Sequence, residues 1–226
     1  MNENKRKVSF SANGKQSIII FILALALLVG LTFLMWPIRM ITSYYAKLCI
    51  NLLLIVAYSV VAVVAMILTG QGKELIPTKN KLWLQLLLAL GISGILCFFI
   101  GILPILCGTS LVGAHSEAST EKIILSAVLN ILFVGVGEEI FFRGYVQNQI
   151  TIWLKKCKWL APLFAAVLFG FWHLVNGSII QVLFATMIGC VFGYAKYFIK
   201  DCSLLSVALA HGLYDFSLVL LTCYML

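Results

Sequence analysis

Apolar residues form seven long runs along the chain, separated by short polar segments. Several runs reach the roughly 20 residues that an α-helix needs to cross a bilayer. They do not alternate with polar residues at every second position, as the strands of a membrane barrel would. We therefore predict an all-α bundle of about seven transmembrane spans, or eight if one segment is missed. The predicted spans are residues 17–36, 47–69, 82–107, 123–150, 159–175, 178–199 and 203–225.

The composition supports a membrane protein without a separate soluble domain. Of the 226 residues, 62% are hydrophobic and 11% are charged, whereas a soluble domain carries roughly 25% charged residues. The polar loops 70–81 and 108–121 are too short to fold alone. Polar residues inside the spans concentrate after residue 130. The first three spans are therefore expected to provide packing and anchoring.

The positive charges predict the orientation. With a cytoplasmic N-terminus, twelve of the 16 Lys and Arg residues fall on the inner side and three on the outer side. Cytoplasmic loops of membrane proteins carry such an excess. We expect a cytoplasmic N-terminus and, with seven spans, an external C-terminus. The lysines cluster at the ends of spans, so the net charge of +8 does not indicate a nucleic-acid partner.

The fourth predicted span contains charged residues that are costly in lipid. Glu138 and Glu139 are adjacent, and Arg143 follows four residues later. Residues four apart share a helix face, so Glu139 and Arg143 can pair. Glu138 is turned by about 100° from Glu139, so we expect it to face elsewhere, toward a water molecule. The alternative is a charged cluster that only stabilises helix packing.

Two later spans carry paired residues at the same spacing. Phe169 lies four residues before His173, and His211 lies four residues before Asp215. The phenyl ring would support the first imidazole, and the Asp would fix the tautomer of the second or act as a ligand. At 1.5 Å per residue, Glu138, His173 and His211 lie about 18, 21 and 12 Å from the inner ends of their helices. We expect one shared cavity, although structural hydrogen bonds between helices would also account for such pairs.

Together, Glu138-Glu139-x-x-x-Arg143, Phe169-x-x-x-His173 and His211-x-x-x-Asp215 resemble the CAAX protease and bacteriocin-processing (CPBP, or Abi) family of intramembrane proteases. The resemblance covers roughly residues 121–217. It implies a peptidase with catalytic residues Glu138, His173, His211 and Asp215, supported by Glu139, Arg143 and Phe169. Many members carry Asn where this chain has Asp215. The expected organisation is a cytoplasmic tail at 1–16, N-terminal transmembrane helices at 17–120 and a catalytic core at 121–226.

The resemblance leaves two mechanisms open. In both, Glu138 takes a proton from a water that attacks a peptide carbonyl. In one, His173 and His211 hold Zn²⁺, which acidifies the water. In the other, Glu138 and His173 activate the water without a metal, and His211 stabilises the oxyanion. The chain lacks the H-E-x-x-H pattern of a zinc site on one helix.

The expected function is an intramembrane endopeptidase that cleaves peptides or membrane proteins within the lipid bilayer. Bacteriocin immunity and signal-peptide processing in a bacterial cell membrane rank above removal of the terminal tripeptide from prenylated proteins. The alternative is a non-catalytic immunity or scaffold protein that binds a peptide or a membrane partner. A transporter is less favoured, because the sequence shows no internal repeat. The sequence does not specify an oligomeric state.

Overall fold

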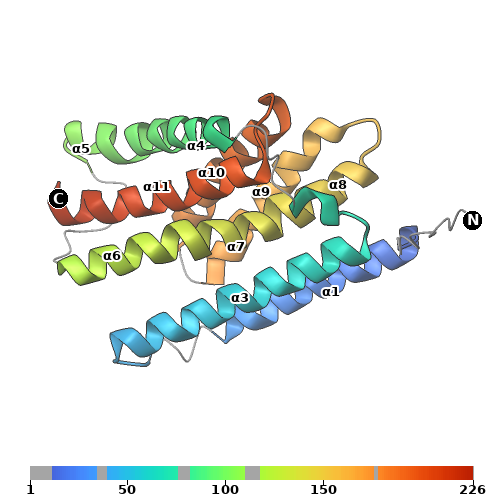
Figure 1. Cartoon of the computed structure of the whole chain (residues 1–226), viewed down its shortest axis with the longest axis horizontal. Coiled ribbons are helices and arrows are strands. Elements are labelled where there is room, and N and C mark those ends of the chain that lie inside the picture. The colour runs from blue at the N-terminus through green and yellow to red at the C-terminus, as the bar shows by residue number, and fades with distance from the viewer. Residues whose placement is uncertain (1–11, 35–39, 76–81, 110–117, 176–177, 226) are drawn as a thin grey trace, which may run out of the picture.

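The structure is a computed structural model that describes residues 12–34, 40–75, 82–109, 118–175 and 178–225. Within these ranges the chain is helical and contains no strand. Helix α1 (Gly14–Phe33) begins with a capping box, in which the side chains of Asn13 and Gln16 each bond the backbone N–H of the other. Helix α3 (Tyr44–Leu68) lies antiparallel beside α1 (Figure 1). A short 3-10 turn, η1 (Gly72–Leu75), follows α3.

Two long helices are interrupted by π-helical turns. The first comprises α4 (Leu82–Leu96), the π segment η3 (Cys97–Ile102) and α5 (Leu103–Leu106). The second runs through residues 120–153 and carries both glutamates. Its parts are α6 (Thr120–Leu129), π segment η4 (Asn130–Val134), α7 (Gly135–Glu139), π segment η5 (Ile140–Val146) and α8 (Gln147–Trp153).

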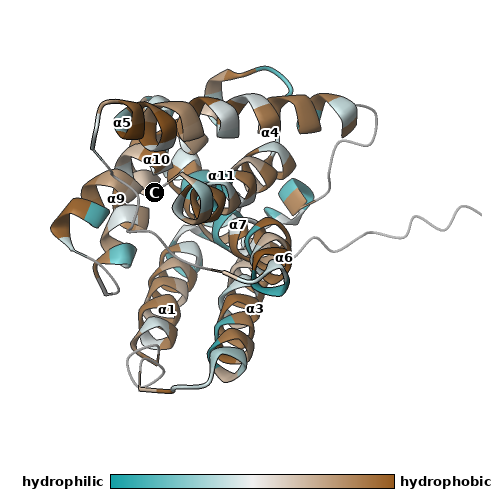
Figure 2. Cartoon of the chain, turned by 90° about the vertical axis from the view of Figure 1, so that its left-hand side faces the viewer, coloured by the Kyte–Doolittle hydropathy of each residue, from teal (hydrophilic) through white to brown (hydrophobic). Residues whose placement is uncertain are grey.

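The remaining helices complete the bundle. A 3-10 turn η6 (Lys158–Leu160) leads into α9 (Ala161–Trp172), which ends in a second 3-10 turn, η7 (His173–Val175). Helices α10 (Ile179–Phe198) and α11 (Leu204–Tyr224) follow, and both have serine N-caps. Figure 2 shows α11 near the centre, between α4, α10 and the long helix, with α1 and α3 as a separate pair.

The all-helical, multi-pass class is confirmed, but the count of seven or eight spans is not. Six helices in the described part of the chain are long and apolar enough to cross a membrane. The predicted fifth span, 159–175, corresponds to the 12-residue helix α9 with a 3-10 turn at each end, which is shorter than a bilayer requires. Nevertheless, α1 begins and α11 ends at opposite ends of the bundle (Figure 1), as the predicted external C-terminus requires.

The outward faces of the helices are apolar, as contact with lipid requires. Ile22 on α1, Leu53 on α3 and Leu87 on α4 are each more than half exposed. Most of the predicted cytoplasmic tail, residues 1–11, lies outside the described residues. The cytoplasmic location of the N-terminus remains a prediction from charge.

A buried glutamine ties α4 to the start of α11. The Gln85 amide nitrogen donates to the carbonyl oxygen of Asp201 at 2.7 Å. Its Oε1 atom accepts hydrogen bonds from the Ser203 hydroxyl at 2.6 Å and from the Ser206 hydroxyl. Buried polar groups in a membrane need such partners. This contact holds the N-terminal end of α11, the helix that carries His211.

Candidate active site

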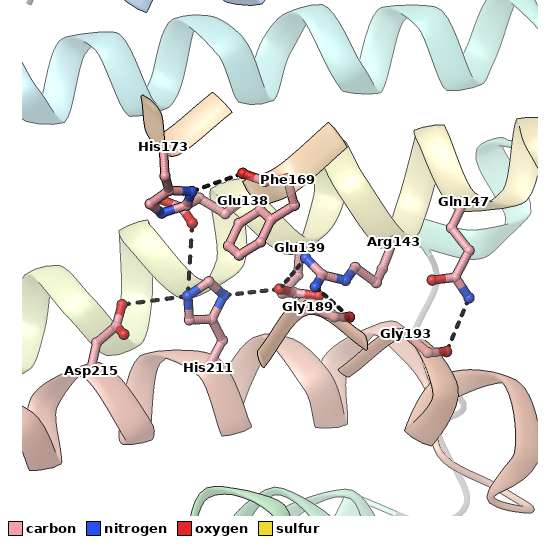
Figure 3. A network of polar contacts seen from close by, with 10 residues as sticks. All are labelled: Glu138, Glu139, Arg143, Gln147, Phe169, His173, Gly189, Gly193, His211 and Asp215. Atoms are coloured by element: carbon pink, nitrogen blue, oxygen red, sulfur yellow. Dashed lines mark hydrogen bonds and ion pairs between the residues drawn. The ribbon is translucent and has the colours of Figure 1, made fainter. Parts of the chain in front are cut away.

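Glu139 is the centre of a buried polar network (Figure 3). Its Oε1 atom lies 2.8 Å from Nη1 of Arg143 and 2.8 Å from Nδ1 of His211. The side chains of Glu139 and Arg143 are completely buried, and His211 is 4% exposed. A charge buried this deeply is tolerated only when it is paired and hydrogen-bonded. The predicted Glu139–Arg143 pair is therefore present, and it extends to a residue on another helix.

Arg143 connects this network to α9 and α10. Its Nη2 atom donates to the carbonyl oxygen of Gly189 on α10 at 2.9 Å. Its guanidinium carbon lies 4.6 Å from the centre of the Phe169 ring on α9, a cation–π contact. A Cβ atom on Gly189 would lie 3.1 Å from both Nη2 and the Phe169 ring. The absence of a side chain at Gly189 therefore lets three helices meet at one guanidinium.

Glu138 was predicted to face away from Glu139, but both side chains contact His211. Its Oε2 atom lies 3.7 Å from Nε2 of His211, so both glutamates contact the same imidazole. The physical reason is that the ring lies opposite α7 and presents its two nitrogens to different side chains. Two carboxylates that diverge by about 100° can then each reach one nitrogen. Glu138 also lines a cavity of about 300 Å³ bounded by α1, α3 and the long helix.

Asp215 faces His211 as the spacing of four residues predicted, but it is not the carboxylate closest to the ring. Its Oδ2 atom lies 3.5 Å from Nε2 of His211, longer than a strong hydrogen bond between charged groups. Glu139, at 2.8 Å from Nδ1, is the closer carboxylate. The residue that orients His211 is therefore Glu139, and Asp215 lies on the opposite edge of the ring.

His173 lies where α9 gives way to the 3-10 turn η7. Its Nδ1 atom is 2.9 Å from the carbonyl oxygen of Phe169. The Phe169 ring centre lies 4.6 Å from that of His173 and 5.8 Å from that of His211. Phe169 therefore supports His173 as predicted, through its backbone carbonyl oxygen and through its ring. The same ring also contacts His211.

The hydrogen bonds place a hydrogen on the Nδ1 atom of both histidines. A carbonyl oxygen only accepts, so Nδ1 of His173 carries the hydrogen, which leaves the lone pair of a neutral ring on Nε2. Nδ1 of His211 likewise donates to the Glu139 carboxylate. Nε2 of His211 faces the carboxylates of Glu138 and Asp215 at 3.7 and 3.5 Å, distances longer than those of a strong hydrogen bond.

A cavity of about 620 Å³ opens beside the histidines. It is bounded by η3, α9, α10 and α11 and has the size of an ordinary ligand pocket. His173, His211 and Asp215 all line it. The structure therefore brings together the predicted residues of three helices, with Glu138 on one side of the His211 ring and this cavity on the other.

The same residues do not form a ready metal centre. Within the described ranges, no three His, Cys, Asp or Glu side chains are grouped so that they could hold a metal ion. The Nδ1 atoms of His173 and His211 are both engaged by protein oxygens. Nε2 of each ring is left as the atom that could bind a metal ion, as in many zinc sites, but no third ligand is grouped with them in the described part of the chain.

Two glycines bring α11 against the glutamates: Gly135, which the sequence indicated as a point of close helix contact, and Gly212, which sequence reasoning did not identify. A Cβ atom on Gly135 would lie 2.5 Å from the Ala208 carbonyl oxygen, and one on Gly212 would overlap the backbone of Asn130 and Ile131. The backbones of α11 and the long helix therefore touch, which places His211 against Glu138 and Glu139. The signal was present, because Gly212 directly follows His211.

Comparison with known families agrees with the geometry. Residues 120–217 match the family model described as type II CAAX prenyl endopeptidase Rce1-like. The match covers somewhat less than half of the chain and shows that this segment is similar to the Rce1-like CAAX proteases. The Rce1-like segment contains all the predicted site residues, whereas α1, α3 and α4 lie outside it. No curated protein and no solved structure matches the chain.

The family match confirms the resemblance to CAAX proteases that the three motifs predicted. It supports an intramembrane protease, and the six apolar helices indicate a multi-pass membrane protein. A peptide or protein substrate and contact with the lipid bilayer are consistent with both findings.

Proposed function

We propose that this protein is an intramembrane endopeptidase in which Glu138 and His173 activate a water molecule. One observation carries the proposal: Glu138 and Glu139 contact opposite nitrogens of His211, beside a cavity that is also lined by His173 and Asp215. A purely structural ion pair would need only Glu139 and Arg143. Glu138, His173 and Asp215 add titratable groups beside a space large enough for a substrate.

The activated water attacks the carbonyl carbon of a peptide bond. Glu138 accepts a proton from this water, and Nε2 of His173 provides a second acceptor, because its Nδ1 hydrogen is directed at Phe169. The water oxygen forms a bond to the carbonyl carbon. The C–N bond then breaks, and the accepted proton passes to the leaving amine. Burial of Glu138, which is 7% exposed, keeps competing bulk water away from this step.

His211 stabilises the negative charge that develops on the carbonyl oxygen. Its Nδ1 atom is held by Glu139, so Nε2 is the atom available to donate to the oxyanion. The carboxylates around the ring can balance the charge of a protonated imidazole. Arg143 holds Glu139 in place, so it acts on the reaction through Glu139 and His211.

The proposed mechanism uses no metal, in contrast to the zinc-assisted version that the resemblance also allowed. The placement of the side chains supports this choice, because no three His, Cys, Asp or Glu residues in the described ranges are grouped to hold a metal ion. Metal analysis of active, purified protein tests the choice. We expect full activity at less than about one tenth of a zinc ion per chain. Inhibition by a chelator that added zinc reverses would instead support the zinc-assisted version.

We propose that the substrates are peptides or membrane proteins in a bacterial cell membrane, with the N-terminus of the enzyme in the cytoplasm. Bacteriocin immunity and signal-peptide processing are the favoured roles. Cleavage of prenylated proteins, the activity named in the family description, is a further candidate for the same site. The cavity of about 620 Å³ beside the histidines is large enough to hold part of a peptide substrate.

Comparison of peptide termini tests the proposed function. Membranes that contain the wild-type protein are compared with membranes that contain Glu138→Ala, His173→Ala or His211→Ala at equal abundance. We expect new termini only with the wild type. Ser59→Ala, a change on α3 outside both cavities beside the site, is the matched control and should retain cleavage. Full biological function in all three alanine variants would favour a non-catalytic immunity or scaffold protein.

A further inference from the structure

The cavity of about 300 Å³ beside Glu138 is built largely by helices that the catalytic motifs do not include. It lies between α1, α3 and the first half of the long helix. Its polar lining includes Asn51 and Tyr58 from α3 and Asn130 and Glu138 from the long helix. Glu138 lines this cavity, whereas His173 and His211 line the other one. The proposed reacting groups therefore separate two cavities.

The cavity follows one face of α3. Asn51, Leu54, Ile55 and Tyr58 line it at spacings of three, four and seven residues, which is a single helical stripe. The distance from Asn51 to Tyr58 along the axis is about 10 Å at 1.5 Å per residue. An extended chain rises about 3.3 Å per residue, so a stretch of about three residues fits this length.

Helix α3 separates from the long helix in this region. It packs closely against η5 and less against η4. At its first turn, the Tyr45 hydroxyl donates to Oε1 of Glu121 at 2.8 Å, and Lys122 lies 5.4 Å from the centre of the Tyr44 ring. The cavity is thus bounded by close packing at one end and by side-chain contacts at the other.

Two buried oxygens in the lining have no hydrogen-bond partner among the described residues: Oδ1 of Asn51 and Oε2 of Glu138. In an apolar environment an unpaired polar group is unfavourable, because it has lost its hydrogen bonds to water. By contrast, two other polar groups in the lining are hydrogen-bonded to each other: the Trp172 indole donates to the Thr32 hydroxyl at 2.7 Å. An amide N–H that entered the cavity would provide a partner for Asn51.

We propose that this cavity binds an extended, uncharged peptide segment on one side of the scissile bond. Asn51 is a positioning residue that accepts a hydrogen bond from a backbone N–H of this segment. The inference rests on the proposed function, since Glu138, which lines the cavity, would be the group that activates water. The lining of Leu31, Leu54, Ile55 and Leu129 selects apolar side chains. The remainder of the substrate occupies the cavity that the histidines line.

Cleavage kinetics test the role of Asn51. A quenched fluorescent decapeptide of apolar sequence is the probe, with full-length protein in lipid nanodiscs. Asn51→Leu should raise KM roughly 3- to 10-fold, the effect of one net hydrogen bond, and leave kcat within about twofold. Ser59→Ala on the same helix should change neither constant, because its hydroxyl bonds only the Ile55 carbonyl of its own helix. An unchanged KM in Asn51→Leu would overturn the role of Asn51.

Photocrosslinking tests the cavity without requiring cleavage. A benzophenone amino acid replaces Leu54, which lines the cavity, or Leu53, which is 67% exposed on the outer face of α3. Both are placed in a Glu138→Gln chain and irradiated with a biotinylated form of the same decapeptide. We expect crosslinking at position 54 that unlabelled peptide competes away, and little at position 53. Equal crosslinking at both positions, or none at position 54, would overturn the inference.

Failure of the proposed function and failure of the peptide subsite give different results. Crosslinking at position 54 of the Glu138→Gln chain, together with no peptide cleavage by the wild-type enzyme, would refute the proposed function and leave the binding site in place. Cleavage that proceeds normally without crosslinking at position 54, and with the same KM in Asn51→Leu, would refute the peptide subsite and leave the proposed function in place. The latter result would also indicate that only water meets the polar groups of this cavity.

Discussion

Arg143 and His211 bind the same oxygen atom: Oε1 of Glu139 lies 2.8 Å from Nη1 of one and 2.8 Å from Nδ1 of the other. The arginine comes from the same helix as Glu139, and the histidine comes from α11. A contact that anchors the fold is therefore also the contact that orients the proposed catalytic ring. Changes at this oxygen should affect stability and activity together.

Glu139→Gln should destabilise the protein, because it leaves the buried Arg143 cation without its anion. Breaking a buried pair by removing one partner costs about 3–5 kcal/mol. The double variant Glu139→Gln with Arg143→Met removes both charges, so its thermal unfolding midpoint should lie above that of Glu139→Gln alone. Circular dichroism in detergent measures both midpoints. A lower midpoint for the double variant than for the single one would contradict this account.

Glu138→Gln should remove activity and preserve the fold. Its Oε2 atom has no hydrogen-bond partner among the residues that the structure describes and lies 3.7 Å from Nε2 of His211, so the amide breaks few contacts. Loss of the proposed general base should reduce the rate by about 10²- to 10⁴-fold. The measurement is kcat/KM for peptide cleavage, with the unfolding midpoint as the control for folding. A variant with nearly wild-type kcat/KM would exclude Glu138 as the base.

Gly212→Ala should separate α11 from the long helix. Its Cβ atom would overlap the backbone of Asn130 and Ile131, which cannot move as easily as a side chain. Overpacking of this kind costs about 1–3 kcal/mol and would also displace the neighbouring His211. The matched control is Gly91→Ala on α4, where a Cβ atom would meet nothing within 4 Å. Equal unfolding midpoints and activities for the two variants would contradict the close approach.

Asp215→Asn should retain most activity, within about tenfold of wild type, because Glu139 and not Asp215 holds the tautomer of His211. The amide keeps an oxygen beside Nε2. Asp215→Leu should be more damaging, because it removes every polar atom at that position. Peptide cleavage at equal protein concentration compares the two. If Asp215→Asn were as inactive as Asp215→Leu, the negative charge itself would be required.

Contacts within a helix were predictable, and contacts between helices were only partly so. The spacing of four residues correctly indicated that Glu139 pairs with Arg143 and that Phe169 supports His173. The contact between Glu139 and His211 depends on how far α11 is rotated and how closely it approaches. Backbone contact at Gly212 sets that approach, and no periodicity within a single helix contains this information.

The length of an apolar run did not by itself show whether the segment is a membrane span. The run that includes residues 159–175 predicted a span, but the α-helical part is only Ala161–Trp172. The 3-10 turn that begins at His173 ends the helix at the site itself. Hydropathy does not distinguish a spanning helix from a shorter one whose end is functional. Elsewhere, the long apolar runs predicted the ends of the helices to within about three residues.

The glutamates lie on α7, a single short α-helical stretch between the π segments η4 and η5. Such segments occur often at functional sites and can rewind to α geometry when one residue is lost. A chain shorter by one residue in η5 would keep a continuous helix but present different side chains to α10, turned by about 100°. Small differences in length between Glu139 and Trp153 therefore offer related enzymes a route to altered selectivity that requires no new loop.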